Sequence, residues 1–412
     1  MRLLVYEHVS GGGFADEPLP AGVLSEGFAM LKTLTKDFKA AGHSVAITLD
    51  SRIAKLNPPI PADRAVPVTS SCETQAKLHM LSEQADAAYV IAPETDGVLQ
   101  SLVEMVEQTG VTSLNCESGA IAKVSDKAKF PEFIKALVVP LPETMPFSVN
   151  DGVKEIAESV QGDLGFPVVF KPVDGVSCEG VSVVRNKEQV AGAVSKVKAE
   201  SSDKRFLVQK LIEGAAASVS LFSTGRSVIP VSLNRQDVKL ETAKATSSYR
   251  GGVVPFDHPM GAEAFEAAKK ILEAVPGLRG YVGVDFVLTG EEAVAIEVNP
   301  RLTTSYVGLR RAVNFNLAQA IIDSVLKHSL PEHVERCGYT VFSKVETYSP
   351  TVDTLQELYE WDEVVSPPFP VSHDGASALV ASYGETFRDA SRGFREAKKR
   401  VLDIINRGGQ RW

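Results

Sequence analysis

A predicted β-hairpin in the third quarter of the chain carries polar side chains that could bind a metal ion. Apolar residues alternate with Asp285 in its first strand, and Glu297 and Asn299 fall on one face of its second strand. A three-residue loop, Gly290–Glu292, would place Asp285 directly opposite Glu297. Two carboxylates and an amide oxygen, without Cys or His, suit Mg²⁺ or Mn²⁺, and nucleotide phosphates would complete the coordination shell.

The same hairpin has a predicted buried face and a guanidinium close to the oxygen ligands. We expect Val294, Ile296 and Val298 to share the apolar face of the second strand. Arg301 follows Asn299 by two residues and could bind a phosphate or a carboxylate through two parallel hydrogen bonds. The alternative is an edge hairpin whose polar residues merely face water, and the spacing is compatible with both interpretations.

A lysine at the end of an apolar strand forms a second candidate site. The strand Pro167–Lys171 runs into the glycine-bearing turn Asp174–Gly180. Such a turn can fold over phosphates through its backbone N–H groups, with Lys171 as a point charge. It is not a P-loop, because the GxxxxGK[ST] pattern is absent. A solvated lysine before a hairpin turn is the alternative.

A third segment, the strand Phe206–Leu211 followed by Glu213, could contact a nucleoside. The backbone at the end of this strand could bind the edge of an adenine, and Glu213 could accept hydrogen bonds from ribose hydroxyls. An ordinary strand end is the alternative.

Five further residues are weaker candidates. Arg250 precedes two glycines and could hold a γ-phosphate or a substrate carboxylate, or it could belong to a surface turn. His8 lies beside a glycine loop that includes Gly12, where a ligand could approach the backbone. His8 could touch an amine substrate, although a structural histidine is the alternative. Asn234 and Arg235 end a predicted strand on the side of the site.

The first part of the chain alternates short apolar strands with amphipathic helices, which predicts a parallel sheet covered by helices on both faces. Ligand sites in such sheets gather at the carboxyl ends of the strands. A proline-rich hinge, residues 139–146, ends this part, and mixed strands and helices follow it. The expected strands are Leu3–Tyr6, Val45–Leu49, Ala88–Ala92 and Val111–Leu114, and the expected helices are Glu73–Gln84 and Thr95–Gln108.

A chain of 412 residues is long enough for two or three domains. Its 43 lysines and arginines against 52 aspartates and glutamates give a formal charge of −9, which argues against nucleic acid or an anionic membrane as the main partner. The absence of a CxxC pair and of a long apolar run favours a reducing, cytoplasmic location. We expect small-molecule partners, and the sequence is compatible with a homo-oligomer.

In this order, the three segments resemble the ATP-grasp superfamily, whose members bind ATP between two α+β units and join a carboxylate to an amine. The resemblance is most specific in an Asp on one strand followed by Glu-x-Asn-Pro-Arg on the next. It implies ATP and Mg²⁺ or Mn²⁺ as cofactors. The implied metal ligands are Asp285, Glu297 and Asn299. The implied catalytic residues are Arg301, Lys171 and Arg250. The implied ATP-binding residues are Lys127, Lys171, Ser177, Gly180, Gln209, Lys210, Ile212 and Glu213.

Two positions depart from the family pattern. Lys210 stands where many members carry Glu near the adenine amine, and the run 215–217 consists of alanines where many members carry a further acidic residue. Recognition of the base and the ribose therefore differs from that of many relatives.

A narrower resemblance begins at the N-terminus. The segment Val5–Phe14 is similar to the opening of tyramine–glutamate ligases, and Glu213-Gly214 followed by Ala217–Ser220 is similar as well. This resemblance implies that glutamate and tyramine are joined through an acyl phosphate, with release of ADP and phosphate, in the synthesis of a methanofuran-type cofactor. The weak substrate candidates would be His8, Gly12, Asn234 and Arg235.

The resemblance also implies a fold that combines α/β and α+β parts. We expect a Rossmann-like pre-ATP-grasp domain over residues 1–120 and an ATP lid with its linker over 121–212. A catalytic domain with an antiparallel sheet and the metal site would cover 213–335, and a β-rich C-terminal cap would cover 336–412.

Three other functions are compatible with parts of the sequence. The first is an ATP-grasp ligase for another amino acid or a peptide. The second, from a different class, is a nucleotide-binding regulatory protein without catalysis, although the full set of metal ligands and lysines argues against it. A Rossmann dehydrogenase is the weakest alternative, because Gly11–Gly13 lacks the spacing of GxGxxG.

Overall fold

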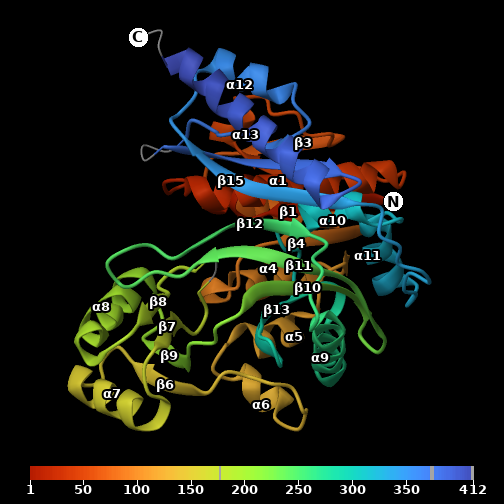
Figure 1. Cartoon of the computed structure of the whole chain (residues 1–412). Helices are drawn as coiled ribbons and strands as arrows, with labels where there is room; N and C mark the ends of the chain where they lie inside the picture. Colours follow the sequence, from red (N-terminus) through yellow and green to blue (C-terminus); the bar gives the residue numbers. More distant parts are fainter. Residues whose placement is uncertain (176–177, 372–374, 410–412) are drawn as a thin grey trace.

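The computed structural model describes residues 1–175, 178–371 and 375–409, and these form three β-sheets with helices packed on them. A five-stranded sheet belongs to the N-terminal part, a four-stranded sheet forms a lobe on one side, and an eight-stranded sheet runs through the middle of the molecule (Figure 1). The mixture of a parallel sheet with antiparallel sheets confirms the predicted fold class. No helix among the described residues combines the length and the apolar composition needed to cross a membrane.

The N-terminal sheet has the order β3-β2-β1-β4-β5, and all its pairs are parallel. Its outer strand β3 was missed from the sequence because it is short and contains Pro67, which suits an edge position. The strands are β1 (Arg2–Glu7), β2 (Ser44–Asp50), β3 (Arg64–Val68), β4 (Ala87–Ile91) and β5 (Thr112–Ser113). The helices are η1 (Val9–Gly13), α1 (Ala21–Ala40), α2 (Ser51–Ala54), α3 (Ser71–Glu83), η2 (Thr95–Gly97), α4 (Val98–Gln108) and α5 (Ser118–Ser125).

The lateral lobe is built on an antiparallel sheet with the order β6-β9-β7-β8. Its edge strand β6 lies in the proline-rich segment that we predicted to be a hinge. Pro146 is tolerated there because an edge strand leaves one side without a ladder partner. The strands are β6 (Thr144–Ser148), β7 (Val168–Pro172), β8 (Ser182–Val184) and β9 (Arg205–Lys210). The helices of the lobe are α7 (Val153–Ser159), η3 (Val160–Leu164), η4 (Lys187–Gln189) and α8 (Val190–Glu200). The short helix α6 (Phe130–Ile134) precedes the lobe and packs against α5 and α9.

The large sheet has the order β14-β13-β10-β11-β12-β15-β17-β16 and contains the C-terminal strands as well as the predicted metal hairpin. Because β15 pairs with β12, the boundary that we expected near residue 335 runs between two strands of one sheet. The strands are β10 (Ala215–Thr224), β11 (Val228–Lys239), β12 (Ser248–Val254), β13 (Arg279–Leu288), β14 (Ala293–Asn299), β15 (Tyr339–Thr347), β16 (Val364–Ser366) and β17 (Ala376–Gly384). The helices are α9 (Gly261–Ala274), α10 (Tyr306–Ala312), α11 (Leu317–Leu326), α12 (Val352–Tyr359) and α13 (Phe387–Gly409).

The β13–β14 hairpin reaches the predicted register by a different route. Asp285 does pair with Glu297, but Leu288 pairs with Ala293, so the connecting loop has one residue more than we predicted. A bulge after Asp285 restores the register, because Phe286 pairs with Ala295 and Ile296 is the extra residue.

The expectation about the apolar face of β14 was wrong. Val298 packs into the core with Ala293 and Ala295, whereas Ile296 is only partly buried. The bulge shifts the alternation by one residue on one side of Ile296, which a strict period of two cannot predict.

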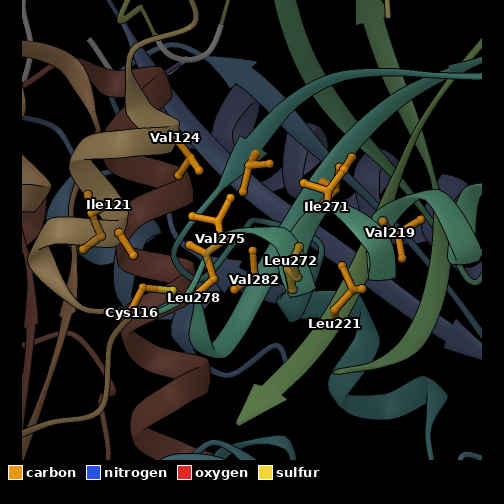
Figure 2. Close-up of a cluster of buried hydrophobic side chains, with 14 of the residues drawn as sticks. Cys116, Ile121, Val124, Val219, Leu221, Ile271, Leu272, Val275, Leu278 and Val282 are labelled. Atoms are coloured by element: carbon orange, nitrogen blue, oxygen red, sulfur yellow. The ribbon is translucent and has the colours of Figure 1, made fainter. Parts of the chain in front are cut away.

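A hydrophobic cluster joins the N-terminal part to the large sheet (Figure 2). Buried side chains of α5 belong to the same cluster as those of α9, β10 and β13, and α5 itself contacts β14. Burying one aliphatic side chain of this kind contributes about 1.5–3 kcal/mol. This packing fixes the end of α5, two residues before Lys127. The labelled members are Cys116, Ile121, Val124, Val219, Leu221, Ile271, Leu272, Val275, Leu278 and Val282.

Candidate active site

The paired carboxylates of the hairpin lie in a cavity between the large sheet and the N-terminal part. Asp285 and Glu297 face each other on neighbouring strands and both line this cavity. The side-chain amide of Asn299 donates to Asp285 Oδ2 at 3.2 Å, and that of Gln236 donates to Asp285 Oδ1 at 3.0 Å. The structure therefore brings the three predicted metal ligands together at one end of the hairpin.

The two carboxylates differ strongly in their electrostatic environment. Burial, and after it the facing charge of Glu297, raise the pKa of Asp285 from 3.8 to about 7. Burial also raises the pKa of Glu297, but the nearby charges of Lys127 and Lys171 outweigh that effect, so its pKa is lowered. A buried carboxylate whose ionisation is costly gains most from a cation placed between the pair.

Two lysines stand beside this acidic pair. Lys127 Nζ lies 3.3 Å from Glu297 Oε2 and donates to the carbonyl of Gly175 at 2.5 Å. Lys171 is buried, and its ammonium has no hydrogen-bond partner among the described residues. Burial and the positive charge of Lys127 lower the pKa of Lys171 to about 8, although Glu297 opposes this shift. An ammonium held in this way is prepared for an anionic ligand.

The glycine-bearing loop after Lys171 reaches across to the N-terminal part. The hydroxyl of Thr95 donates to the carbonyl of Asp174 at 3.1 Å, and the backbone N–H of Asp96 donates to the Asp174 carboxylate at 3.0 Å. Gly180 has a φ of +69°, and a Cβ there would lie 2.6 Å from Pro172 Cγ, so the turn requires glycine. Ser177, a predicted ATP-binding residue, lies outside the described residues.

The predicted adenine segment begins in the last two residues of strand β9. Gln209 donates to the Thr144 hydroxyl at 2.9 Å, and Lys210 donates to the carbonyl of Leu164 at 2.8 Å, so both side chains bind within the lobe. Ile212 lies in the connection between β9 and β10, and Glu213 lies in a shallow depression beside the β13–β14 loop. The side chain of Lys210 is thus engaged at the end of a helix, which leaves only its backbone for a ligand.

Arg301 is anchored from the N-terminal part. Its Nε and Nη2 lie 3.0 and 2.9 Å from Glu94 Oε2, and both side chains are mostly buried. Arg301 also lines the cavity, next to the metal hairpin. The sequence could not reveal this pair, because the two residues are far apart along the chain.

Three of the weak candidates, Arg250, Arg235 and Gly12, are not among the described residues that line the cavity. Arg250 is half-exposed and forms an ion pair with Asp237 at 2.6 Å. Arg235 is exposed and lies on the face of β11 opposite Asn234. Gly12 is buried, and its carbonyl accepts from the Thr74 hydroxyl at 3.0 Å.

The side chains of the two remaining candidates, His8 and Asn234, contact other residues of the protein. His8 packs against Phe14, and burial lowers its pKa to about 4, so the ring is neutral at pH 7. Asn234 on β11 is fully buried and donates at 2.9 Å to the hydroxyl of Ser220 on β10, the strand next to the metal hairpin.

The cavity also contains residues that sequence reasoning missed or did not select. Glu7 ends β1 and Glu94 follows β4, at the carboxyl edge of the parallel sheet where ligand sites gather. That rule could have found both carboxylates. Glu26 on α1 and Tyr249 on β12 carry no comparable signal, because each lies within a regular element.

The donor set fits a hard divalent cation. Asp285, Glu297 and Asn299 supply oxygen atoms without sulfur or nitrogen ligands, and the raised pKa of Asp285 marks a place where positive charge is missing. The described residues hold no group of three or more His, Cys, Asp or Glu that could bind a metal ion on its own. Oxygens of water or of a bound phosphate would complete the coordination shell of such an ion.

Comparison with known proteins agrees with this geometry. A family model of the ATP-grasp domain matches residues 124–305, and a model of the pre ATP-grasp 3 domain matches residues 43–121. The tyramine–L-glutamate ligase of Methanocaldococcus fervens is 29% identical over 341 residues, which are 82% of this chain and 99% of that protein.

Two solved structures share the fold over almost the whole chain. An ATP-grasp superfamily protein from Archaeoglobus fulgidus matches 92% of this chain and 99% of its own, with a TM-score of 0.61 and 24% identity. Biotin carboxylase from Campylobacter jejuni matches 96% of this chain and 90% of its own, with a TM-score of 0.73 and 16% identity. The two matched family models together span more than half of the chain. The chain therefore belongs to the ATP-grasp family and is an ATP-dependent carboxylate–amine ligase.

Proposed function

We propose that this protein joins the side-chain carboxylate of glutamate to the amine of tyramine and releases ADP and phosphate. The observation that carries the proposal is the facing pair Asp285 and Glu297, with Lys127 and Lys171 beside it, in a cavity that the N-terminal part closes. The similarity to a tyramine–L-glutamate ligase over 82% of the chain supports the choice of the two substrates.

In this proposal Asp285, Glu297 and Asn299 hold Mg²⁺, or Mn²⁺ in its place, against the phosphates of ATP. The bound ion would neutralise charge on the phosphate oxygens. Lys127 and Lys171 reach the same region as positive charges, and the buried ammonium of Lys171 has no hydrogen-bond partner in the part of the chain that the structure describes. Phosphoryl transfer depends mainly on such positioning and electrostatic stabilisation.

The chemistry proceeds through an acyl phosphate. The substrate carboxylate takes the γ-phosphoryl group, the amine attacks the acyl carbon, and phosphate leaves. Arg301, held by Glu94, is placed to orient an anionic group beside the hairpin. The loop around Asp174 already contacts Thr95 and Asp96, so it can exclude water that would hydrolyse the intermediate.

The remaining assignments stay predictions. The backbone of residues 209–212 would bind adenine and Glu213 the ribose, while Ser177 and Gly180 would contact phosphate. A cytoplasmic location, a role in the synthesis of a methanofuran-type cofactor and a homo-oligomer also stay predictions. Arg250 would need to leave Asp237 to reach a ligand.

The test is release of ADP from MgATP in the presence of glutamate and tyramine, with each substrate omitted in turn and the product identified by mass. Release that requires both substrates and a γ-glutamyltyramine mass would support the proposal. If ADP release depends on glutamate but no product with tyramine forms, the proposed ligase function would stand and tyramine would be rejected as the amine substrate. No release with either substrate would reject the proposed pair.

Two variants test the site in the same assay. Glu297→Gln should lose turnover and keep the fold, because the amide cannot supply the negative charge opposite Asp285. Glu117→Gln is the matched control, since Glu117 forms an exposed pair with Arg279 at 3.6 Å outside the cavity. Near-normal activity of Glu297→Gln would contradict the metal assignment.

A further inference from the structure

Most of the carboxylates in the cavity already have partners. Glu7 accepts from the backbone N–H groups of Val9 and Ser10 at 3.0 and 2.7 Å. Glu26 accepts from Lys344 and from Thr304, each at 2.7 Å.

The two carboxylates of the hairpin are engaged as well. Both oxygens of Asp285 accept from side-chain amides, and Glu297 is paired with Lys127. In the proposed function both also face the metal ion. These four carboxylates therefore already have hydrogen-bond or ion-pair partners before an amine enters the cavity.

Glu94 differs from the other four. Its Oε2 is held by Arg301, whereas its Oε1 is buried and has no hydrogen-bond partner among the described residues. The side chain is 6% exposed and lines the cavity. A buried carboxylate oxygen without a donor is unfavourable unless a ligand supplies one.

The surroundings of Glu94 suit an amine with an apolar body. Val9, Val23, Met30 and Ile91 line the same cavity and offer an apolar wall. A primary amine could place its nitrogen at the free oxygen and its hydrocarbon part against these side chains.

We propose that Glu94 Oε1 binds the nitrogen of the amine substrate and accepts its proton during coupling. This inference rests on the proposed ligase function. The lone pair of the neutral amine forms the C–N bond to the acyl carbon, and the C–O bond to phosphate breaks with its electrons on the leaving phosphate. The proton that the nitrogen loses passes to Glu94 Oε1. Arg301 fixes the carboxylate through its other oxygen.

The position of Glu94 is coupled to the phosphate loop. The next two residues, Thr95 and Asp96, make the contacts to Asp174 that hold this loop against the N-terminal part. The same contacts therefore also hold the chain segment that carries Glu94.

Glu94→Gln is the sharpest variant, because the amide keeps an oxygen for Arg301 and presents an N–H₂ group where the amine nitrogen would bind. Two reactions are compared: amide formation with tyramine, and hydroxamate formation when hydroxylamine traps the acyl phosphate. Hydroxylamine is a small nucleophile that is largely neutral at pH 7 and needs no carboxylate to hold it. We expect amide formation to fall at least 100-fold, with a raised KM for tyramine, and hydroxamate formation to stay within about threefold of wild type.

The controls separate this inference from the proposed function. Glu117→Gln should leave both reactions unchanged, and Glu94→Asp should recover part of the amide formation because it restores a carboxylate. Equal losses of amide and hydroxamate in Glu94→Gln would overturn the inference, since Glu94 would then act only through Arg301. Unchanged amide formation would overturn it as well. A wild-type protein that forms no amide with glutamate and tyramine would reject the proposed substrates before any variant is compared.

Discussion

The ionisation of Asp285 should make the metal-free protein less stable as the pH rises, and Asp285→Asn should remove this dependence. The folded-state pKa of Asp285 is raised from 3.8 to about 7, because the group is buried and faces Glu297. Between these two values the folded protein binds more protons than the unfolded chain, so the free energy of unfolding falls as the pH increases. The favourable contribution is complete below about pH 4 and is lost as the pH rises through 7.

The size of the effect follows from the shift. One pKa unit corresponds to about 1.4 kcal/mol. Relative to a neutral side chain at position 285, the carboxyl group costs about 2 kcal/mol at pH 5 and about 4 kcal/mol at pH 8. The free energy of unfolding of Asp285→Asn, relative to that of wild type, should therefore rise by about 2–3 kcal/mol between pH 5 and pH 8. The variant keeps an oxygen that can accept from Gln236 or Asn299, so little else changes.

The assay is denaturation of both proteins in EDTA at pH 5 and pH 8, followed by the same measurement with Mg²⁺. In EDTA the denaturation midpoint of Asp285→Asn should exceed that of wild type by several degrees more at pH 8 than at pH 5. Mg²⁺ should raise the wild-type midpoint at pH 8 and leave the variant unchanged, because only the carboxylate pair binds the ion. Equal pH dependence of the two proteins in EDTA would refute the reasoning.

Three further substitutions test the surroundings of the hairpin. Gly283→Ala would bring a Cβ to 2.7 Å from Thr303 Cγ2, so we expect at least a tenfold loss of ADP release; normal activity would contradict it. Tyr281→Phe removes a buried hydroxyl that bonds Ser220 and Thr303, which should lower stability by about 1–3 kcal/mol in thermal denaturation. Lys171→Met should raise the KM for ATP and cut ADP release at least 100-fold, and a loss below tenfold would count against its role.

The register of the metal hairpin could be predicted because a two-residue period leaves few choices. Apolar residues at alternate positions of β13 define its buried face, and Asp285 must then point to the other side. The same rule failed on β14, where the bulge at Ile296 breaks the period. The predicted pairing of Asp285 with Glu297 was still correct, because two deviations offset each other. The loop is one residue longer than we predicted, and the bulge adds one residue, Ile296, to β14.

Proline-containing strands were harder to predict than apolar ones. Both β3 and β6 contain a proline and lie at the edge of their sheets, where one row of backbone groups needs no partner. In the sequence such a segment has the composition of a loop. Only the neighbouring strand shows that such a segment pairs, and for β6 that neighbour, β9, is distant along the chain.

The cavity wall opposite the hairpin depends on contacts that no local pattern encodes. Lys344 on β15 donates to Glu26 on α1, which also accepts from Thr304 beside the hairpin, so three distant parts of the chain meet at one carboxylate. The C-terminal segment that we expected to form a β-rich cap thus supplies a cation beside the cavity. Because β15 extends the same sheet as β12, its position follows from backbone pairing and not from a flexible docking contact. The C-terminal strands are therefore part of the site's framework, and the shape of the cavity depends on their pairing.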